Sequence, residues 1–72
     1  MMTKGTVLNF VRKYHIDRYG LSGVVTNVQK VQSRPYGVWT TLVDIVTDTG
    51  VKIQWPTSWV RSATYAVADD AT

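Results

Sequence analysis

Apolar and polar residues alternate most regularly in the stretch TGVKIQWPTSWV, residues 49–60. Val51, Ile53 and Trp55 are separated by single polar residues, which is the period of two expected of a strand with one buried face. Pro56 cannot donate a hydrogen bond to a neighbouring strand, so it is expected to end this strand. The pattern therefore predicts a strand up to Trp55, a tight turn containing a single helical turn, and re-entry of the chain into the fold.

Four more strands are expected elsewhere in the chain. In the second of them, Val28 and Val31 are three residues apart, and this odd spacing predicts a bulge or a strong bend between the two valines. The last strand is expected to pair with the first and so to close a barrel. The expected ranges are 4–12, 20–32, 38–47 and 59–63.

Glycine and proline mark the connections between these strands. Residues 14–22 follow neither the helix nor the strand period and contain a glycine, which predicts a long first loop. A proline and a glycine predict a turn over residues 33–37. Residues 48–50 are expected to form a tight hairpin with Gly50 in the left-handed conformation, which makes the third and fourth strands antiparallel neighbours.

Length and composition agree with one small all-β domain. The chain has 72 residues, with twelve Val, three Ile and ten Thr against four Ala and no Glu, and this usage favours strands over helices. The barrel is expected to occupy residues 4–63, between a frayed N-terminus at residues 1–3 and a flexible acidic tail at residues 64–72. A domain of this size has little room for a large catalytic cleft.

The stretch at residues 49–60 resembles the end of an SH3 domain, which runs T-G, four variable residues, an apolar residue and then P-S-N-Y-V. The resemblance implies a small five-stranded SH3-like barrel. It also implies that Trp39 takes the place of the groove tryptophan of that family. The residues that carry the resemblance are Thr49, Gly50, Pro56, Thr57, Ser58, Trp59 and Val60.

The segment GLSGVVTNV, residues 20–28, resembles the G-x-x-G-x-V-x-x-V core of a KOW motif. This motif occurs in SH3-like domains of ribosomal and transcription-elongation proteins that bind RNA or other proteins. Physically, Gly20 suits a turn that needs a positive φ, and Gly23 suits close backbone packing where the strand enters the sheet.

An OB-fold barrel is the alternative architecture. The letters KGTV, followed by Phe10, resemble the opening of a cold-shock domain, which binds single-stranded nucleic acid on an OB barrel. An OB barrel normally carries a helix between its third and fourth strands, and the hairpin at residues 48–50 leaves no room for one. We therefore prefer the SH3-like arrangement.

Charge and the absence of certain residues narrow the function classes. Eight Lys and Arg against five Asp give a net charge of +3, and leaving out Asp69 and Asp70 raises it to +5, which favours anionic partners. There is no cysteine, no apolar run near the roughly 18 residues of a membrane span and no signal-peptide core. These observations predict a soluble protein, either cytoplasmic or virion-associated if it comes from a bacteriophage.

No catalytic constellation is visible. His15 and Asp17 are two residues apart in the expected first loop, but no nucleophile, second histidine or Gly-rich phosphate loop accompanies them. We therefore expect no enzyme activity, no cofactor and no metal, and interpret His15 as an ordinary loop residue.

The first loop, the turn at residues 33–37 and the turn after Trp55 are expected to converge on one side of the barrel. Exposed aromatic rings among cations suit stacking on bases combined with phosphate contacts. Trp55 is expected in the core, with at least one of the other two tryptophans partly exposed. The candidate ligand-binding residues are Arg12, Lys13, Tyr14, Arg18, Tyr19, Arg34, Tyr36, Trp39, Pro56 and Trp59.

The leading hypothesis is a non-catalytic module that binds RNA or DNA with little sequence specificity. The first alternative is a protein-interaction or assembly module that docks by strand addition or by exposed tryptophans. Small SH3-like barrels of this kind occur as bacteriophage accessory or structural proteins. A reader of acidic or proline-rich peptides is the second alternative. In a third interpretation, the tyrosines only cover one end of the barrel. A monomer or a weak homo-oligomer is expected.

Overall fold

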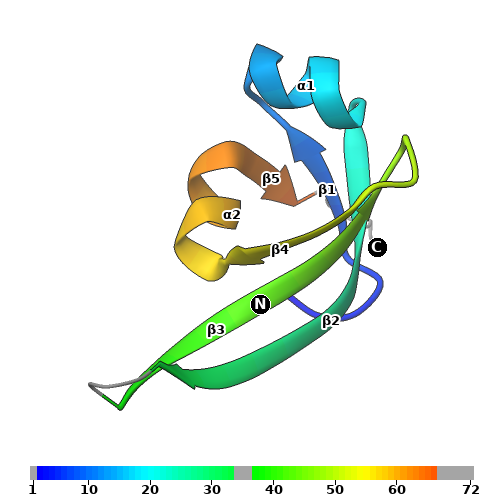
Figure 1. Ribbon diagram of the computed structural model, residues 1–72. Coiled ribbons are helices and arrows are strands. Elements are labelled where there is room, and N and C mark those ends of the chain that lie inside the picture. Colours follow the sequence, from blue (N-terminus) through cyan, green and yellow to red (C-terminus); the bar gives the residue numbers. More distant parts are fainter. Residues whose placement is uncertain (1, 34–36, 67–72) are drawn as a thin grey trace.

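In the computed structural model, the described residues form five strands in one antiparallel sheet and two short helices that pack on it (Figure 1). The structure describes residues 2–33 and 37–66. The strands lie in the order β4-β3-β2-β1-β5, and the expected all-β class is confirmed. The elements are β1 (Val7–Phe10), α1 (Lys13–Tyr19), β2 (Ser22–Ser33), β3 (Val38–Thr47), β4 (Lys52–Pro56), α2 (Thr57–Ala63) and β5 (Thr64–Ala66).

The sheet is barrel-like but not closed. The last strand pairs with the first, as expected, with Leu8 opposite Ala66 and Phe10 opposite Thr64. β4 and β5 lie at the two ends of the strand order. Helix α2, which joins these two strands in the chain, packs against β3, β4 and β5. The buried core is formed by Leu8, Phe10, Val25, Val43, Ile45, Trp55, Val60 and Ala63.

The long hairpin of β2 and β3 is the largest element of the sheet (Figure 1). β3 has the expected bounds. The irregularity of β2 lies between Val25 and Asn27 and not between Val28 and Val31, so its expected position is wrong. The reason is that Val25 and Val28 are also three residues apart. An extra residue between them leaves Val28 opposite the buried Val43, just as Val25 is opposite the buried Ile45.

The connection between β3 and β4 is the expected tight hairpin. The Gly50 amide donates to the Thr47 carbonyl at 2.9 Å, and the Thr47 amide donates to the Val51 carbonyl at 2.9 Å. Gly50 has a φ of 81°, which is the left-handed conformation expected for it. No helix stands between the third and fourth strands, in agreement with the argument against an OB barrel.

The long first loop expected over residues 14–22 is wrong, because α1 occupies most of it. Ile16 and Tyr19 are half-buried and pack against the core, and their spacing of three places them on one face of a helix. The helix ends at Gly20, whose amide donates to the Ile16 carbonyl at 2.9 Å and whose φ is 90°. With only seven residues, α1 is too short to show a clear helical period in the sequence.

The fifth strand expected at residues 59–63 is also wrong, because these residues belong to α2. Val60 and Ala63 are buried and three residues apart, which is a helical spacing that was not recognised. β5 follows directly at Thr64–Ala66, so these three residues belong to the sheet and not to the expected tail. The first strand is shorter than expected as well, since Lys4 and Gly5 lie in a turn before it.

Candidate nucleic-acid interface

A cluster of aromatic rings lies beneath α1, with Trp55 at its centre. The ring centroid of Trp55 is 4.9 Å from that of His15 and 6.0 Å from that of Tyr19. Phe10 meets the same indole edge-on at 5.8 Å. Trp55 is only 8% exposed, so its expected place in the core is confirmed.

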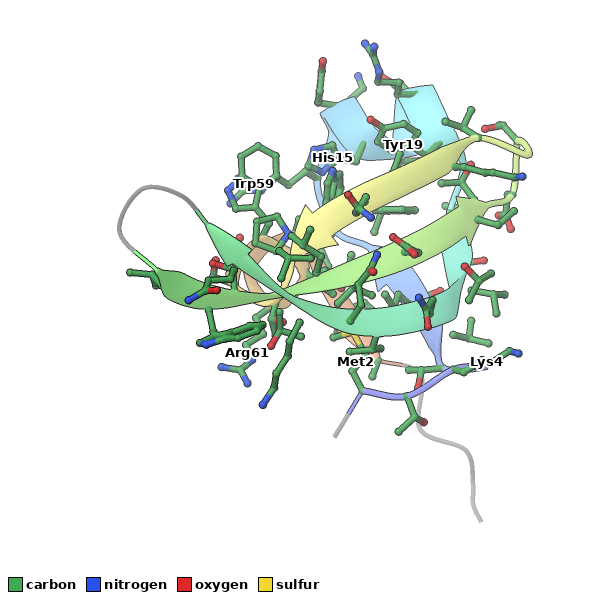
Figure 2. The ribbon with its side chains drawn as sticks, turned by 60° about the horizontal axis from the view of Figure 1, so that its bottom comes forward. Met2, Lys4, His15, Tyr19, Trp59 and Arg61 are labelled. Carbon is green, nitrogen blue, oxygen red and sulfur yellow. The ribbon has the colours of Figure 1, made fainter. Side chains whose placement is uncertain are left out.

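The cluster continues to the surface at two points. Trp59, in the first turn of α2, lies edge to face against Trp55 with ring centroids 5.9 Å apart. Tyr14, on α1, lies edge to face against His15 at 5.4 Å. Their exposed fractions are 65% for Tyr14 and 57% for Trp59. The rings of Tyr14, His15, Trp55 and Trp59 thus form a contiguous row with exposed ends and a buried middle, which Figure 2 shows around His15 and Trp59.

Three cations accompany this row on and beside α1. Arg12, Lys13 and Arg18 are all exposed, and Asp17 is the acid of the same helix. The guanidinium of Arg18 lies over the Tyr14 ring, with Cζ 5.8 Å from the centroid, and its Nη1 donates to the Tyr14 hydroxyl at 3.3 Å. This arrangement is a cation–π contact at an exposed ring. We call Arg12, Lys13, Tyr14, Arg18 and Trp59 the aromatic-basic face.

The remaining candidate residues do not belong to this face. Tyr19 is half-buried inside the cluster, where its ring contacts Phe10 and Trp55. Trp39 is 63% exposed, so both tryptophans outside the core are exposed. It borders a separate shallow hollow with the half-buried Pro56 and the exposed Arg61.

Two further candidates cannot be placed. Arg34 and Tyr36 lie outside the described residues. The expected convergence of the turn at residues 33–37 with the other two connections therefore stays a prediction.

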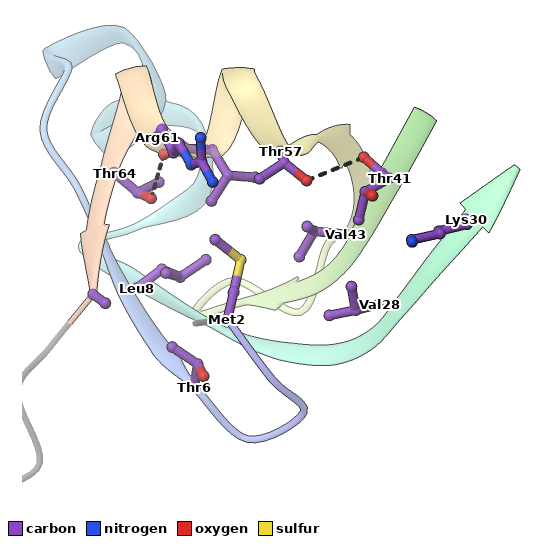
Figure 3. A pocket seen from close by; sticks show the side chains of 12 residues that line it. Met2, Thr6, Leu8, Val28, Lys30, Thr41, Val43, Thr57, Arg61 and Thr64 are labelled. Atoms are coloured by element: carbon purple, nitrogen blue, oxygen red, sulfur yellow. Dashed lines mark hydrogen bonds between the residues drawn. The ribbon is translucent and has the colours of Figure 1, made fainter. Parts of the chain in front are cut away.

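A cavity of about 630 Å³ on the opposite side of α2 was missed by the reasoning from sequence. It opens between the N-terminal segment, β2, β3, α2 and β5 (Figure 3). Its apolar lining includes Leu8 and Val28, and its cations are Lys30 and Arg61. The odd spacing of Val25 and Val28 was the one available signal, because it turns Val28 to the core side of the long hairpin.

Residues 2–33 and 37–66 contain no group of three or more His, Cys, Asp or Glu side chains that could hold a metal ion. His15 lies in α1 and not in a loop, and its Nδ1 is buried without a hydrogen-bond partner in the described part of the chain. The rings packed around His15 give it a structural role in the aromatic cluster. Neither described helix has the length and apolar character needed to cross a membrane.

No protein family, curated protein or solved structure matches this chain. A functional conclusion therefore depends on the physical chemistry of the two surfaces described above.

Proposed function

We propose that this protein is a non-catalytic module that binds single-stranded RNA or DNA through the aromatic-basic face, with little sequence specificity. The observation that carries the proposal is the row of rings from Tyr14 to Trp59, exposed at both ends and flanked by the cations of α1. Exposed aromatic rings among cations are the usual platform for single strands, since every base has a face to stack on.

The packing of the face favours binding because its exposed rings rest on neighbouring side chains. Trp59 contacts the buried Trp55, and Tyr14 contacts His15 and Arg18, which restricts the conformations open to both rings. A ligand that stacks on these rings loses less free energy to side-chain ordering than it would on free rings. The phosphates would be met by Arg12, Lys13 and Arg18, which supply affinity without reading the bases.

The strand order supports the further proposal that the domain is an SH3-like barrel. The last strand returns to pair with the first, and a tight hairpin joins β3 to β4. This is the arrangement that the resemblance of residues 49–60 implies. It favours the SH3-like assignment over the OB alternative.

A protein-assembly role is the second candidate, and one observation favours it. Val38 and Trp39 are 57% and 63% exposed at the start of β3, in the stretch of β3 that extends past its last residue pair with β4, Leu42 with Pro56. An apolar pair beside an unpaired edge suits docking by strand addition. Assembly of this kind predicts a mass that rises with concentration on size-exclusion chromatography, whereas a nucleic-acid module can remain monomeric.

The deciding experiment is a fluorescence-anisotropy titration of labelled single-stranded RNA, single-stranded DNA and duplex DNA from low to physiological salt. The three cations of the face predict a slope of log affinity against log salt of about −2 on single strands, at about 0.7 per phosphate contact. Binding to single strands should exceed binding to the duplex. An absence of binding at low salt would overturn the proposal and direct the search to protein partners.

A further inference from the structure

The cavity behind α2 lies on the opposite side of that helix from the aromatic-basic face. Figure 2 shows Trp59 on the side of His15 and Tyr19, whereas Arg61 points to the side of Met2. Only two positions separate Trp59 and Arg61 in the helix, so their side chains project in very different directions. The two sites can therefore be tested independently.

The floor of the cavity is apolar. Leu8, Val43 and Val60 are almost completely buried, and Val28 and Met2 add partly exposed apolar walls. Figure 3 shows the thioether of Met2 reaching between β1 and α2 into this space. A cavity of about 630 Å³ with such a lining has the size and character of a site for a small apolar ligand.

Two of the four threonine hydroxyl groups that line the cavity donate hydrogen bonds within the protein. The Thr57 hydroxyl donates to the Thr41 carbonyl at 3.2 Å, and the Thr64 hydroxyl donates to the Val60 carbonyl at 2.6 Å (Figure 3). These polar groups therefore do not require hydrogen bonds from a ligand. An apolar chain can lie against them without leaving a buried donor unsatisfied.

The charged side chains that line the cavity are both positive. Lys30 extends from β2 and Arg61 from α2, and the described residues that line the cavity include no acid. Figure 3 shows the ammonium end of Lys30 turned toward the cavity. Two cations beside an apolar floor complement a molecule with an apolar chain and one anionic head group.

We propose that this cavity binds an anionic amphiphile, with its alkyl chain against Met2 and Val28, above the buried floor of Leu8, Val43 and Val60, and its carboxylate near Lys30 and Arg61. Met2 covers part of the floor in the structure. Because Met2 belongs to the short segment before β1, it can move aside without disturbing the sheet. The ligand class is an alkyl carboxylate, either free or as the acyl part of a lysolipid.

The test is a calorimetric titration of the full chain with decanoate, with decanol and decyltrimethylammonium as neutral and cationic controls. Decanoate should bind saturably at one site and more tightly than either control. In a parallel 15N NMR titration, the amides of Leu8, Val43 and Val60 should shift, whereas those of α1 should not. Equal affinity for decanol, shifts centred on α1, or no saturable binding would overturn the proposal.

Two variants locate the head group and the chain. Lys30→Gln combined with Arg61→Gln should weaken decanoate binding about tenfold or more, since both charge-assisted contacts are lost. Lys4→Gln combined with Lys52→Gln is the control that removes the same charge from residues outside the cavity lining, and it should leave the affinity unchanged. Val28→Trp should fill the cavity and abolish binding while the amide spectrum stays dispersed. If Val28→Trp fails to fold, the charge variants still decide.

Two further measurements distinguish a lipid ligand from a free acid, and a small ligand from a second copy of the chain in the cavity. A decanoyl lysophosphatidylglycerol titration distinguishes a lipid from a free acid: preference for either one keeps the proposal, and failure of both overturns it. Shifts of the same cavity amides on dilution of the protein alone would assign the cavity to a second copy of the chain and overturn the proposal.

Discussion

The indole rings of Trp55 and Trp59 meet edge to face, with centroids 5.9 Å apart and ring planes at 67°. The first ring is 8% exposed and the second 57%. Trp55 is the last residue but one of β4 and Trp59 lies in the first turn of α2, so the change from strand to helix after Pro56 places an exposed ring directly on the core. Replacing either ring by alanine should therefore have very different consequences.

Trp59→Ala should weaken binding to single-stranded nucleic acid by about 1–3 kcal/mol, since one stacking ring is lost. The free energy of unfolding should change by no more than about 1 kcal/mol, because Trp59 is mostly exposed. Trp55→Ala should instead destabilise the protein by about 3–5 kcal/mol, as other large core truncations do. Anisotropy titrations and chemical denaturation measure the two effects.

Trp39→Ala is the matched control for the Trp59 variant. Trp39 is similarly exposed, at 63%, but it borders a separate hollow. Its removal should leave nucleic-acid affinity unchanged. If both variants weaken binding equally, the site extends along the β2–β3 hairpin and the aromatic-basic face is defined too narrowly.

Replacing the cations of α1 should change the salt dependence of binding. Lys13→Gln combined with Arg18→Gln should make the slope of log affinity against log salt less steep by about 1.4, because two phosphate contacts are lost at about 0.7 each. Lys52→Gln, on the edge strand β4, should leave the slope unchanged. An unchanged slope in the double variant would show that these cations do not meet phosphates.

Gly23→Ala should destabilise the sheet. An added Cβ would lie 2.6 Å from Cγ2 of Ile45 and 3.2 Å from the Val46 carbonyl oxygen, so the two strands would have to move apart. Overpacking of this kind costs about 1–3 kcal/mol, and thermal or urea denaturation would measure it. Val24→Ala, at the neighbouring exposed position, should cost clearly less. Equal losses would mean that the strands yield easily at this point.

Asp48 ties the β3–β4 hairpin to the start of β2. Its carboxylate accepts hydrogen bonds from the backbone amide and the hydroxyl of Ser22, both at 3.1 Å. Asp48→Ala should lower the free energy of unfolding by about 1–2 kcal/mol, since two hydrogen bonds to a charged acceptor at the surface are lost. Asp17→Ala, an exposed acid on α1, should change it by less than about 0.5 kcal/mol. A loss from Asp17→Ala as large as that from Asp48→Ala would contradict the assignment.

The parts of the fold that sequence reasoning predicted are those with strong local signals. The bounds of β3, the hairpin closed by Gly50 and the core position of Trp55 all follow from alternation and turn chemistry. The physical reasons given for Gly20 and Gly23 are also confirmed, by a φ of 90° in the first and by the close approach of Ile45 to the second.

Helix α1 was not predicted, and α2 was predicted only as a single helical turn, both for the same physical reason. A seven-residue helix contributes only two or three inward-facing residues, such as Ile16 and Tyr19 in α1. Such a short pattern cannot be distinguished from a loop in a chain rich in β-branched residues. Helix α2 extends beyond a single turn to Ala63 and occupies the residues of the predicted last strand, so the three residues of β5 were assigned to the tail.

The candidate site was predicted in part. The aromatic residues and cations near α1 were selected for their chemistry, and ring contacts through His15 and Trp55 connect Tyr14 to Trp59, with Arg18 over the Tyr14 ring. Trp39 was included because of a family resemblance, but it borders a separate hollow. Its position depends on the length of the β2–β3 hairpin, which no local sequence pattern specifies. The cavity depends on a bulge and on a helix that were predicted elsewhere or not at all.

The packing of α2 against β4 and β5 has a consequence for aggregation. Both strands are edges of the sheet, and exposed edges carry unpaired backbone groups that can recruit strands of other molecules. One seven-residue helix contacts both of these strands and is joined directly to both. Local melting of α2 would therefore expose more of both edge strands at once, and we expect the tendency of the chain to aggregate to depend on this short helix.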